Sequence, residues 1–273
     1  MMIWRLFAKS KVCTMKFKQS IISLLAVFCF FAANAQETPS DEKPSPFRNT
    51  EFQIRAGFSI GGFAPIPYPV EIRKIESYNP TMALGLEADV TKWLDDNREL
   101  GLRVGVRAEG RGMKTGAQVK DYHTEVIGDG GQKVSGNFTG MVQTTVKNSY
   151  FTIPVLVIFG VTERWNLYTG PYFSTLTEKN FSGYVYDGYL RVDGPTGPPL
   201  IFEGDNKGPY DFSEDLRIFQ WGIMVGGEFT LRKHLQLFSE LTWGLNDLFQ
   251  KDFNTVTFDM YAIYLNVGFG YRF

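Results

Sequence analysis

The chain is poor in cysteine and histidine, and beyond its first 35 residues it has no long hydrophobic run. Its 273 residues include two cysteines, Cys13 and Cys29, and two histidines. Because both cysteines precede residue 36, the rest of the chain can form no disulfide and offers no thiol for catalysis or for a zinc site. After that point the longest apolar run, residues 153–161, has nine residues. A membrane-spanning helix needs roughly 20 apolar residues, so this run suits a tilted strand instead.

The N-terminus has the pattern of a secretory signal peptide. Lys16 and Lys18 precede an apolar run over residues 21–31, and the sequence Ala-Asn-Ala at residues 33–35 offers small side chains for cleavage before Gln36. The apolar run is too short to span a membrane as a helix. We therefore expect the protein to leave the cytoplasm.

Cleavage changes the composition of the chain. We expect residues 1–35 to be removed, with Met15 as the better start, and residues 36–50, rich in proline, serine and charge, to form a flexible periplasmic leader. Loss of residues 1–35 removes five basic residues and no acidic one, which leaves 23 basic against 29 acidic residues and a net charge of about −6. That charge argues against nucleic acid as a partner.

The end of the chain carries the most informative pattern. From residue 261 to residue 273 every odd position is apolar or aromatic, whereas the even positions include Asn266, Gly268 and Arg272. A period of two predicts a strand with one apolar face and one polar or small face. A strand with lipid on one side and a crowded polar lumen on the other has this division, which indicates a transmembrane β-barrel.

Other segments alternate in the same way. The sequence predicts eight strands, over residues 52–62, 81–93, 100–112, 149–161, 165–176, 217–231, 235–245 and 261–273. Short connections at 94–98, 162–164 and 232–234 alternate with long ones at 63–80, 113–148, 177–216 and 246–258. This alternation around an even strand count is typical of outer-membrane barrels, whose short turns face the periplasm and whose long loops face outward.

We therefore expect an all-β, eight-stranded antiparallel transmembrane β-barrel over residues 51–273. It would lie in the outer membrane, in contact with its lipid, with both termini in the periplasm. Alternating residues within 133–146 and 181–202 predict hairpins that extend above the membrane. A ten-stranded barrel is the alternative, if one of these hairpins enters the wall.

The polar positions of these strands carry charges of both signs. Five basic and five acidic residues are predicted to face inward: Arg55, Arg103, Arg107, Arg111, Arg272, Glu87, Asp89, Glu109, Glu228 and Glu240. A barrel of eight strands is narrow enough to be filled by its own side chains. Because unpaired buried ions are costly, we expect a lumen ion-pair network, with inward glycines leaving room for long side chains. The alternative interpretation of the same residues is an ion or proton path.

Aromatic residues predict the two membrane interfaces. Those at the periplasmic strand ends are Trp165, Tyr271 and Phe273, and those near the outer ends are Trp221, Trp243 and Tyr261. Trp93 lies near the periplasmic set but on the inward parity. Either the strand bends before Trp93 or the assigned register is wrong by one residue.

The sequence contains no persuasive catalytic or metal-binding pattern. His234 lies in a predicted periplasmic turn, and His123, in an outer loop, has no serine or aspartate at a spacing that would single it out as a catalytic base. The acidic residues that could suggest calcium lack the EF-hand spacing and are interpreted as a solvated loop: Asp205, Asp211, Glu214 and Asp215. We expect no enzyme activity, no cofactor and no bound metal.

The order of several short motifs resembles that of a known family. These motifs are Tyr-Phe-Thr-Ile-Pro at 150–154, Gly-Pro-Tyr-Phe at 170–173, the strand 222–229, Ser-Glu-Leu-Thr-Trp-Gly-Leu at 239–245 and Gly-Phe-Gly-Tyr-Arg-Phe at 268–273. In this order they resemble the outer-membrane β-barrel family of Bacteroidota that includes the PorT-like proteins. The resemblance covers about residues 50–273.

What the resemblance implies is an eight-stranded barrel inserted by the outer-membrane assembly machinery, which recognises a terminal strand ending in an aromatic residue such as Phe273. Members differ over segments that correspond to 113–148 and 177–216, so a role in protein secretion is not carried over. Two classes of function are open. The first is a non-catalytic barrel for envelope structure, docking or assembly of other envelope or secretion proteins. The alternative is a small-molecule or ion transporter or pore.

Overall fold

The computed structural model describes residues 48–128, 130–192, 194 and 196–273. The predicted signal peptide and residues 36–47 of the predicted leader lie outside the described residues. Residues 49–273 form one compact unit of strands. Its elements, in chain order, are β1 (Thr50–Pro65), β2 (Ile72–Asn79), β3 (Ala83–Trp93), β4 (Leu100–Ile127), β5 (Lys133–Gly160), β6 (Trp165–Glu178), β7 (Phe181–Arg191), β8 (Pro199–Phe202), β9 (Gly208–Asp211), the 3-10 turn η1 (Ser213–Asp215), β10 (Phe219–Thr230), β11 (Leu235–Gly244) and β12 (Met260–Arg272). In this part of the chain no helix is long and apolar enough to cross a membrane, a finding that concerns helices alone.

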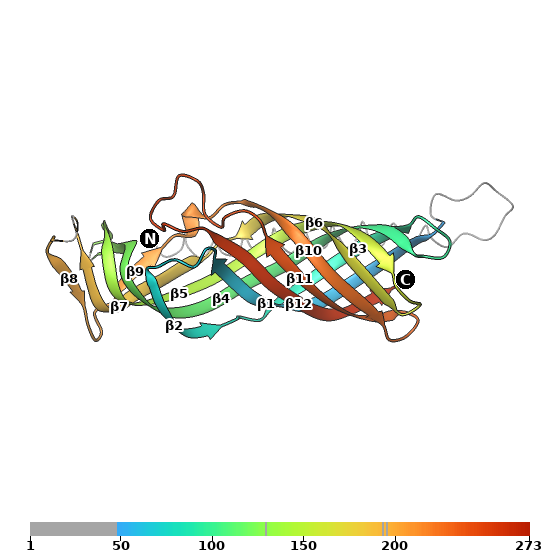
Figure 1. Ribbon diagram of the computed structural model, residues 1–273, viewed down its shortest axis with the longest axis horizontal. Helices are drawn as coiled ribbons and strands as arrows, with labels where there is room; N and C mark the ends of the chain where they lie inside the picture. The colour runs from blue at the N-terminus through green and yellow to red at the C-terminus, as the bar shows by residue number, and fades with distance from the viewer. Residues whose placement is uncertain (1–47, 129, 193, 195) are drawn as a thin grey trace, which may run out of the picture. The chain divides into compact units, whose positions relative to one another are not determined.

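Eight of these strands close into a ring (Figure 1). Each pairs antiparallel with two neighbours, in the order β1, β12, β11, β10, β6, β5, β4 and β3, and β3 returns to β1. The predicted eight-stranded antiparallel barrel is confirmed. A ten-stranded wall would have required a hairpin such as β7–β8 to enter the ring. Instead, β7 pairs with the part of β5 beyond the ring, and β8 pairs with β7.

Side chains alternate across the wall of this ring. On β11, Leu237, Leu241 and Trp243 are exposed on the outer face, whereas Gln236 and Glu240 are buried inside. The arrangement is the reverse of that in a water-soluble protein. Hydrocarbon accepts the apolar outer face, and the polar groups of a lumen must be satisfied by one another.

One end of the ring, which we call the short-turn end, has the predicted short connections. Residues 94–99, 161–164 and 231–234 join β3 to β4, β5 to β6 and β10 to β11, and the C-terminus lies at the same end (Figure 1). In the first of these turns Asp95 accepts hydrogen bonds from the backbone N–H groups of Glu99 and Leu100, both at 2.8 Å.

At the opposite end β4 and β5 continue far beyond the ring. Each has 28 residues, and they pair as far as Ile127 and Lys133. β2 flanks the distal part of β4, β7 flanks that of β5, and β8 and β9 pair with β7. We call this sheet, made of β2, residues 113–127 of β4, residues 133–148 of β5, β7, β8 and β9, the extension.

The prediction that 113–148 is a connection between wall strands is therefore wrong in one respect, because most of it belongs to the same two strands. The outward face of β4 changes from apolar residues to Lys114, Gln118 and Lys120 at this level. That change ends the lipid-facing pattern without ending the strand.

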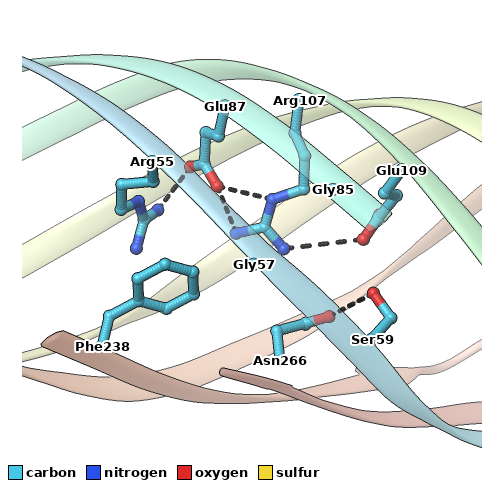
Figure 2. A pocket seen from close by; sticks show the side chains of 9 residues that line it. All are labelled: Arg55, Gly57, Ser59, Gly85, Glu87, Arg107, Glu109, Phe238 and Asn266. Atoms are coloured by element: carbon cyan, nitrogen blue, oxygen red, sulfur yellow. Dashed lines mark hydrogen bonds and ion pairs between the residues drawn. The ribbon is translucent and has the colours of Figure 1, made fainter. Parts of the chain in front are cut away.

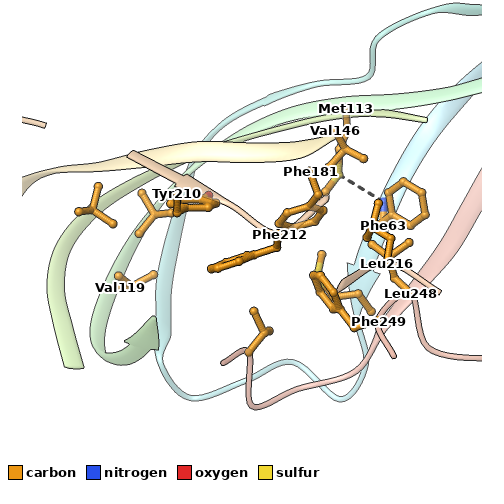
Figure 3. Close-up of a cluster of buried hydrophobic side chains, with 14 of the residues drawn as sticks. Phe63, Met113, Val119, Val146, Phe181, Tyr210, Phe212, Leu216, Leu248 and Phe249 are labelled. Carbon is orange, nitrogen blue, oxygen red and sulfur yellow. Dashed lines mark hydrogen bonds between the residues drawn. The ribbon is translucent and has the colours of Figure 1, made fainter. Parts of the chain in front are cut away.

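A hydrophobic core lies between the extension and the loop before β12 (Figure 3). Phe181, from the start of β7, packs edge to face on Phe249 with ring centroids 5.0 Å apart. Tyr210 and Phe212 stack at 5.0 Å, and Phe63 from the end of β1 closes the side nearest the ring. The extension therefore has an ordinary folded interior of its own, next to a barrel whose interior is polar.

Candidate functional site

The interior of the barrel contains a network of buried charges, of which β1 and β3 supply one part. The register places Arg55 opposite Glu87, and Asp89 follows two residues later on the same inward face of β3. Arg55 forms an ion pair with Glu87, and its Nε donates to Asp89 Oδ2 at 2.9 Å. From the far wall, the hydroxyl of Tyr168 accepts a hydrogen bond from Arg55 Nη1 at 3.0 Å.

Arg107 of β4 joins this group to Glu109, as Figure 2 shows, and also to Glu240. Its Nη2 lies 2.5 Å from Glu87 Oε2, its Nη1 lies 2.8 Å from Glu240 Oε1, and the same Nη1 lies 3.7 Å from Glu109 Oε2. Glu240 also lies 3.6 Å from Arg55 Nη1. Glu87 and Glu240 each face two arginines, so the central network has no single indispensable pair.

Two further pairs lie above and below this centre. Toward the short-turn end, Arg103 faces Glu228 with two N–O distances of 2.9 Å, the two-pronged geometry that makes such pairs strong. Toward the extension, Arg111 Nη2 lies 2.7 Å from Glu109 Oε1. The guanidinium of Arg111 also lies 4.8 Å from the ring centroid of Tyr150, within the range of a cation–π contact.

Arg272, the tenth residue of the predicted network, lies apart from the other nine. It is half-buried at the short-turn end, where its Nη1 is 3.8 Å from Glu51 Oε1. Trp93 lies at the same end, almost fully buried, and its indole N–H donates to Glu51 Oε2 at 2.9 Å. The sequence suggested either a bend before Trp93 or a register error of one residue. Neither occurs, because Trp93 points into the barrel in the register that the sequence predicted. The sequence interpretation missed Glu51, which joins Trp93 and Arg272.

The network fills the lumen. Its four arginines and five carboxylates are each 5% exposed or less. Glycine makes room where the charges crowd, since a Cβ at Gly105 would lie 2.1 Å from Asp89 Oδ1. The void beside Arg55, Glu87 and Arg107 measures about 20 Å³, room for about one water molecule.

The predicted interface aromatics lie mostly on the outer surface. Trp165, Tyr271 and Phe273 are exposed at the short-turn end, and Trp221 and Trp243 are exposed toward the other end. Tyr261 is half-buried, with its hydroxyl donating to Asp259 Oδ2 at 3.3 Å.

A second candidate site is an apolar pocket of about 440 Å³ in the extension, beyond the charged network. Among its lining residues are Met113 and Val119 of β4 and Ile72, Ile75 and Tyr78 of β2, and no described lining residue is charged. Two register shifts in β2, at Arg73 and Glu76, bring these three β2 residues to one face. Sequence reasoning missed β2 because its apolar residues recur every third position instead of every second.

Of the histidines and acidic residues considered from sequence, His123 and Asp215 line one polar pocket of about 270 Å³, and His234 lies at the opposite, short-turn end. His123, on β4, has its Nδ1 3.0 Å from Asn137 Oδ1, and His234 Nδ1 lies 2.8 Å from the carbonyl oxygen of Arg272. Asp211 accepts hydrogen bonds from Ser213, and burial raises the pKa of Asp215. Over the described ranges no group of three or more His, Cys, Asp or Glu side chains is placed to hold a metal ion.

Comparison with known families gives one match. The sequence model described as outer membrane protein β-barrel domain matches residues 34–250, which is more than half of the chain. No curated protein matches the chain.

Solved structures with a similar fold are outer-membrane proteins. Ail, the attachment invasion locus protein of Yersinia pestis, solved with the heparin analogue sucrose octasulfate, is 12% identical, with 83% of this chain and 100% of that chain covered and a TM-score of 0.37. The outer membrane protein OprG from Pseudomonas aeruginosa is 11% identical, with 83% and 97% covered and a TM-score of 0.29. The outer membrane protease OmpT from Escherichia coli is 12% identical, with 86% and 100% covered and a TM-score of 0.29. At these identities and scores, no property of the three proteins transfers to this chain.

Proposed function

The chain belongs to the outer membrane protein β-barrel domain family, and we propose that it is a non-catalytic barrel with a closed lumen that displays the extension outside the cell. The observation that carries the proposal is the filled lumen, where nine charged residues are buried and the void beside Arg55, Glu87 and Arg107 measures about 20 Å³. Ions that pair at this density hold the wall strands together. They leave no path wide enough for a hydrated solute.

The proposed orientation places the short-turn end, with both ends of the barrel sequence, in the periplasm. Outer-membrane barrels have short periplasmic turns and long outer segments, and the two ends of this ring differ in the same sense. β12 ends at Arg272, directly before Phe273, which suits insertion by the outer-membrane assembly machinery. The motifs at 150–154 and 268–273 favour placing the chain with the PorT-like barrels of Bacteroidota.

The part proposed to act on other molecules is the extension, which has a folded core of its own and an exposed outer edge. Leu200 and Ile201 of β8, the last strand in the sheet order, are exposed at that edge, where an envelope protein can dock. The absence of a catalytic role is supported by His123, whose ring nitrogens contact Asn137 and Ser135 and not an acid.

A transporter or pore is the competing function, and a planar-bilayer conductance measurement separates the two. The wild-type protein should give no sustained open steps, because the lumen charges occupy the cross-section. The control is the double variant Arg55→Gly with Arg107→Gly, which removes the two central side chains and should give open steps if it refolds. Sustained open steps from the refolded wild type would refute the closed barrel.

A further inference from the structure

One edge of the wall is unpaired where the barrel meets the extension. β1 pairs with β12 as far as Pro65 but with β3 only as far as Ser59. β2, which continues the line of β3 beyond residue 82, pairs with β4 alone. Within the described residues, the segment 60–65 of β1 and all of β2 therefore face each other without a backbone ladder between them.

The apolar pocket opens at this gap. Its lining includes Gly61, Gly62 and Ala64 of β1, from both faces of the strand, so the pocket wraps around the free edge. It also includes Ile263, which lies on the outward parity of β12, two residues from the lipid-facing Leu265. The lining is thus continuous with the outer surface of the barrel.

The side chains at the gap lie in the open although they belong to the pocket. Tyr68, Ile75 and Tyr78 are 55%, 51% and 51% exposed. Tyr78 reaches across to β1, where a Cβ added to Gly62 would lie 3.0 Å from its hydroxyl oxygen and 2.9 Å from Met113 Sδ. The absence of a side chain at Gly62 leaves the space that the Tyr78 hydroxyl and Met113 Sδ occupy between β1 and β2.

The chemistry of the lining selects a neutral, apolar occupant. The polar groups of the described lining are hydroxyls of tyrosine and threonine, such as Thr115 and Tyr122, and none is charged. Phe63 and Met113 form a floor that separates the pocket from Arg111, with Phe63 N–H donating to Met113 Sδ at 3.3 Å. The volume of about 440 Å³ is in the usual range for small-molecule pockets, of about 300–1,000 Å³.

We propose that this pocket binds an alkyl chain that leaves the membrane surface beside Ile263 and enters through the gap between β1 and β2, its polar end staying at the tyrosine rim. This proposal rests on the proposed function in one respect: if the extension faces outward, the alkyl chain comes from the outer leaflet of the membrane. The chain could come from a membrane lipid or from a free fatty acid, and the experiment has one arm for each source.

The test uses the refolded protein in phosphatidylcholine nanodiscs. One arm contains palmitic acid with a diazirine in its chain, and the other contains phosphatidylcholine with the same modified acyl chain. After illumination, mass spectrometry maps the labelled residues. We expect label within residues 113–122 and 142–144, in addition to the unavoidable label on the lipid-facing side chains of the barrel.

Two variants and one matched control make the result specific. Ala117→Trp fills the pocket from the inward face of β4 and should lower pocket labelling by about tenfold, equivalent to about 1.4 kcal/mol. Gln118→Trp, the next residue on the exposed face of the same strand, should leave it unchanged. Gly62→Leu places a side chain against Tyr78 and Met113 at the gap itself and should give the same loss as Ala117→Trp from the opposite wall of the pocket.

Each outcome has a meaning, with label on the barrel face as the internal standard. Pocket label from one probe alone identifies the source of the chain, and label from both supports either source. Label confined to the barrel face, or pocket label that Ala117→Trp and Gly62→Leu leave unchanged, would overturn the proposal. The conductance result is independent of this test, so a failure of the closed barrel and a failure of the alkyl site are distinguishable.

Discussion

Removal of Glu228 should destabilise the barrel more than removal of Glu240, although both are buried carboxylates that face arginine. Arg103 is held by Glu228 through two contacts of 2.9 Å, and no other carboxylate of the described residues forms an ion pair with it. In Glu228→Ala the guanidinium stays buried without a counter-ion. Breaking such a pair costs about 3–5 kcal/mol.

Glu240→Ala leaves a different situation. Arg107 keeps Glu87 and Glu109, and Arg55 keeps Glu87 and Asp89, so each arginine still faces acid. The loss is then that of hydrogen bonds to a charged group, about 1.5–3 kcal/mol. Because the centre of the network is redundant, Glu228→Ala should lower the free energy of unfolding more than Glu240→Ala does.

The assay is urea unfolding of the refolded barrel in lipid vesicles, followed by tryptophan fluorescence. Glu76→Ala, which breaks an exposed pair with Lys74, is the control and should change the free energy of unfolding by less than about 1 kcal/mol. The double variant Arg103→Met with Glu228→Leu should recover most of the loss, because it removes both buried charges together. If Glu228→Ala unfolds at the same urea concentration as Glu76→Ala, the interpretation of the lumen as an energetically coupled network is refuted.

Further predictions concern the lipid face, the short-turn end and the extension. Leu265→Arg should lower the free energy of unfolding in vesicles by about 2–4 kcal/mol because Leu265 faces the membrane, and a loss no larger than that of Leu265→Ala would contradict this placement. Trp93→Ala should cost about 3–5 kcal/mol by opening a cavity at the short-turn end. Trp93→Phe should cost less, because the phenylalanine ring fills most of that cavity and the main loss is the indole hydrogen bond, worth about 0.5–1.5 kcal/mol; equal losses in urea unfolding would argue against the cavity as the cause. Burial raises the pKa of Tyr210, so the folded chain holds this proton more tightly than the unfolded chain, and the stability of the extension should fall as pH rises above about 10. In near-UV circular dichroism Tyr210→Phe should reduce that alkaline loss, and an unchanged profile would exclude Tyr210 as its source.

The ring of strands could be predicted from sequence because its cause is local. Lipid outside and a polar lumen inside impose a period of two on every wall strand, as at Leu237, Leu241 and Glu240, and that period is visible without any knowledge of partners. The same alternation predicted that nine charged residues face inward, and in the structure these nine form ion pairs with one another. Which acid faces which arginine depends on how strands distant in sequence are placed in the barrel, as for Arg103 and Glu228. This pairing cannot be predicted from the sequence of a single strand.

The extension could be predicted only in part, for two physical reasons. β4 continues past Lys114, where its outer face leaves lipid for water, so the lipid-facing pattern stops while the strand does not. β2 contains two bulges, and these replace the period of two by a spacing of three at Ile72, Ile75 and Tyr78. The apolar pocket depends on both features, which is why no sequence pattern indicated it.

The proposal that the barrel displays its extension outside the cell is tested most directly by cysteine labelling in whole cells. The chain has no cysteine after residue 29, so a cysteine introduced beyond that point is the only one in the barrel. Gln132→Cys lies at the exposed tip of the β4–β5 hairpin, and Lys233→Cys lies in the exposed short turn between β10 and β11. With a membrane-impermeant maleimide, position 132 should be labelled in intact cells and position 233 only after the outer membrane is permeabilised. Labelling of position 233 but not position 132 in intact cells would contradict the proposed orientation and the function built on it.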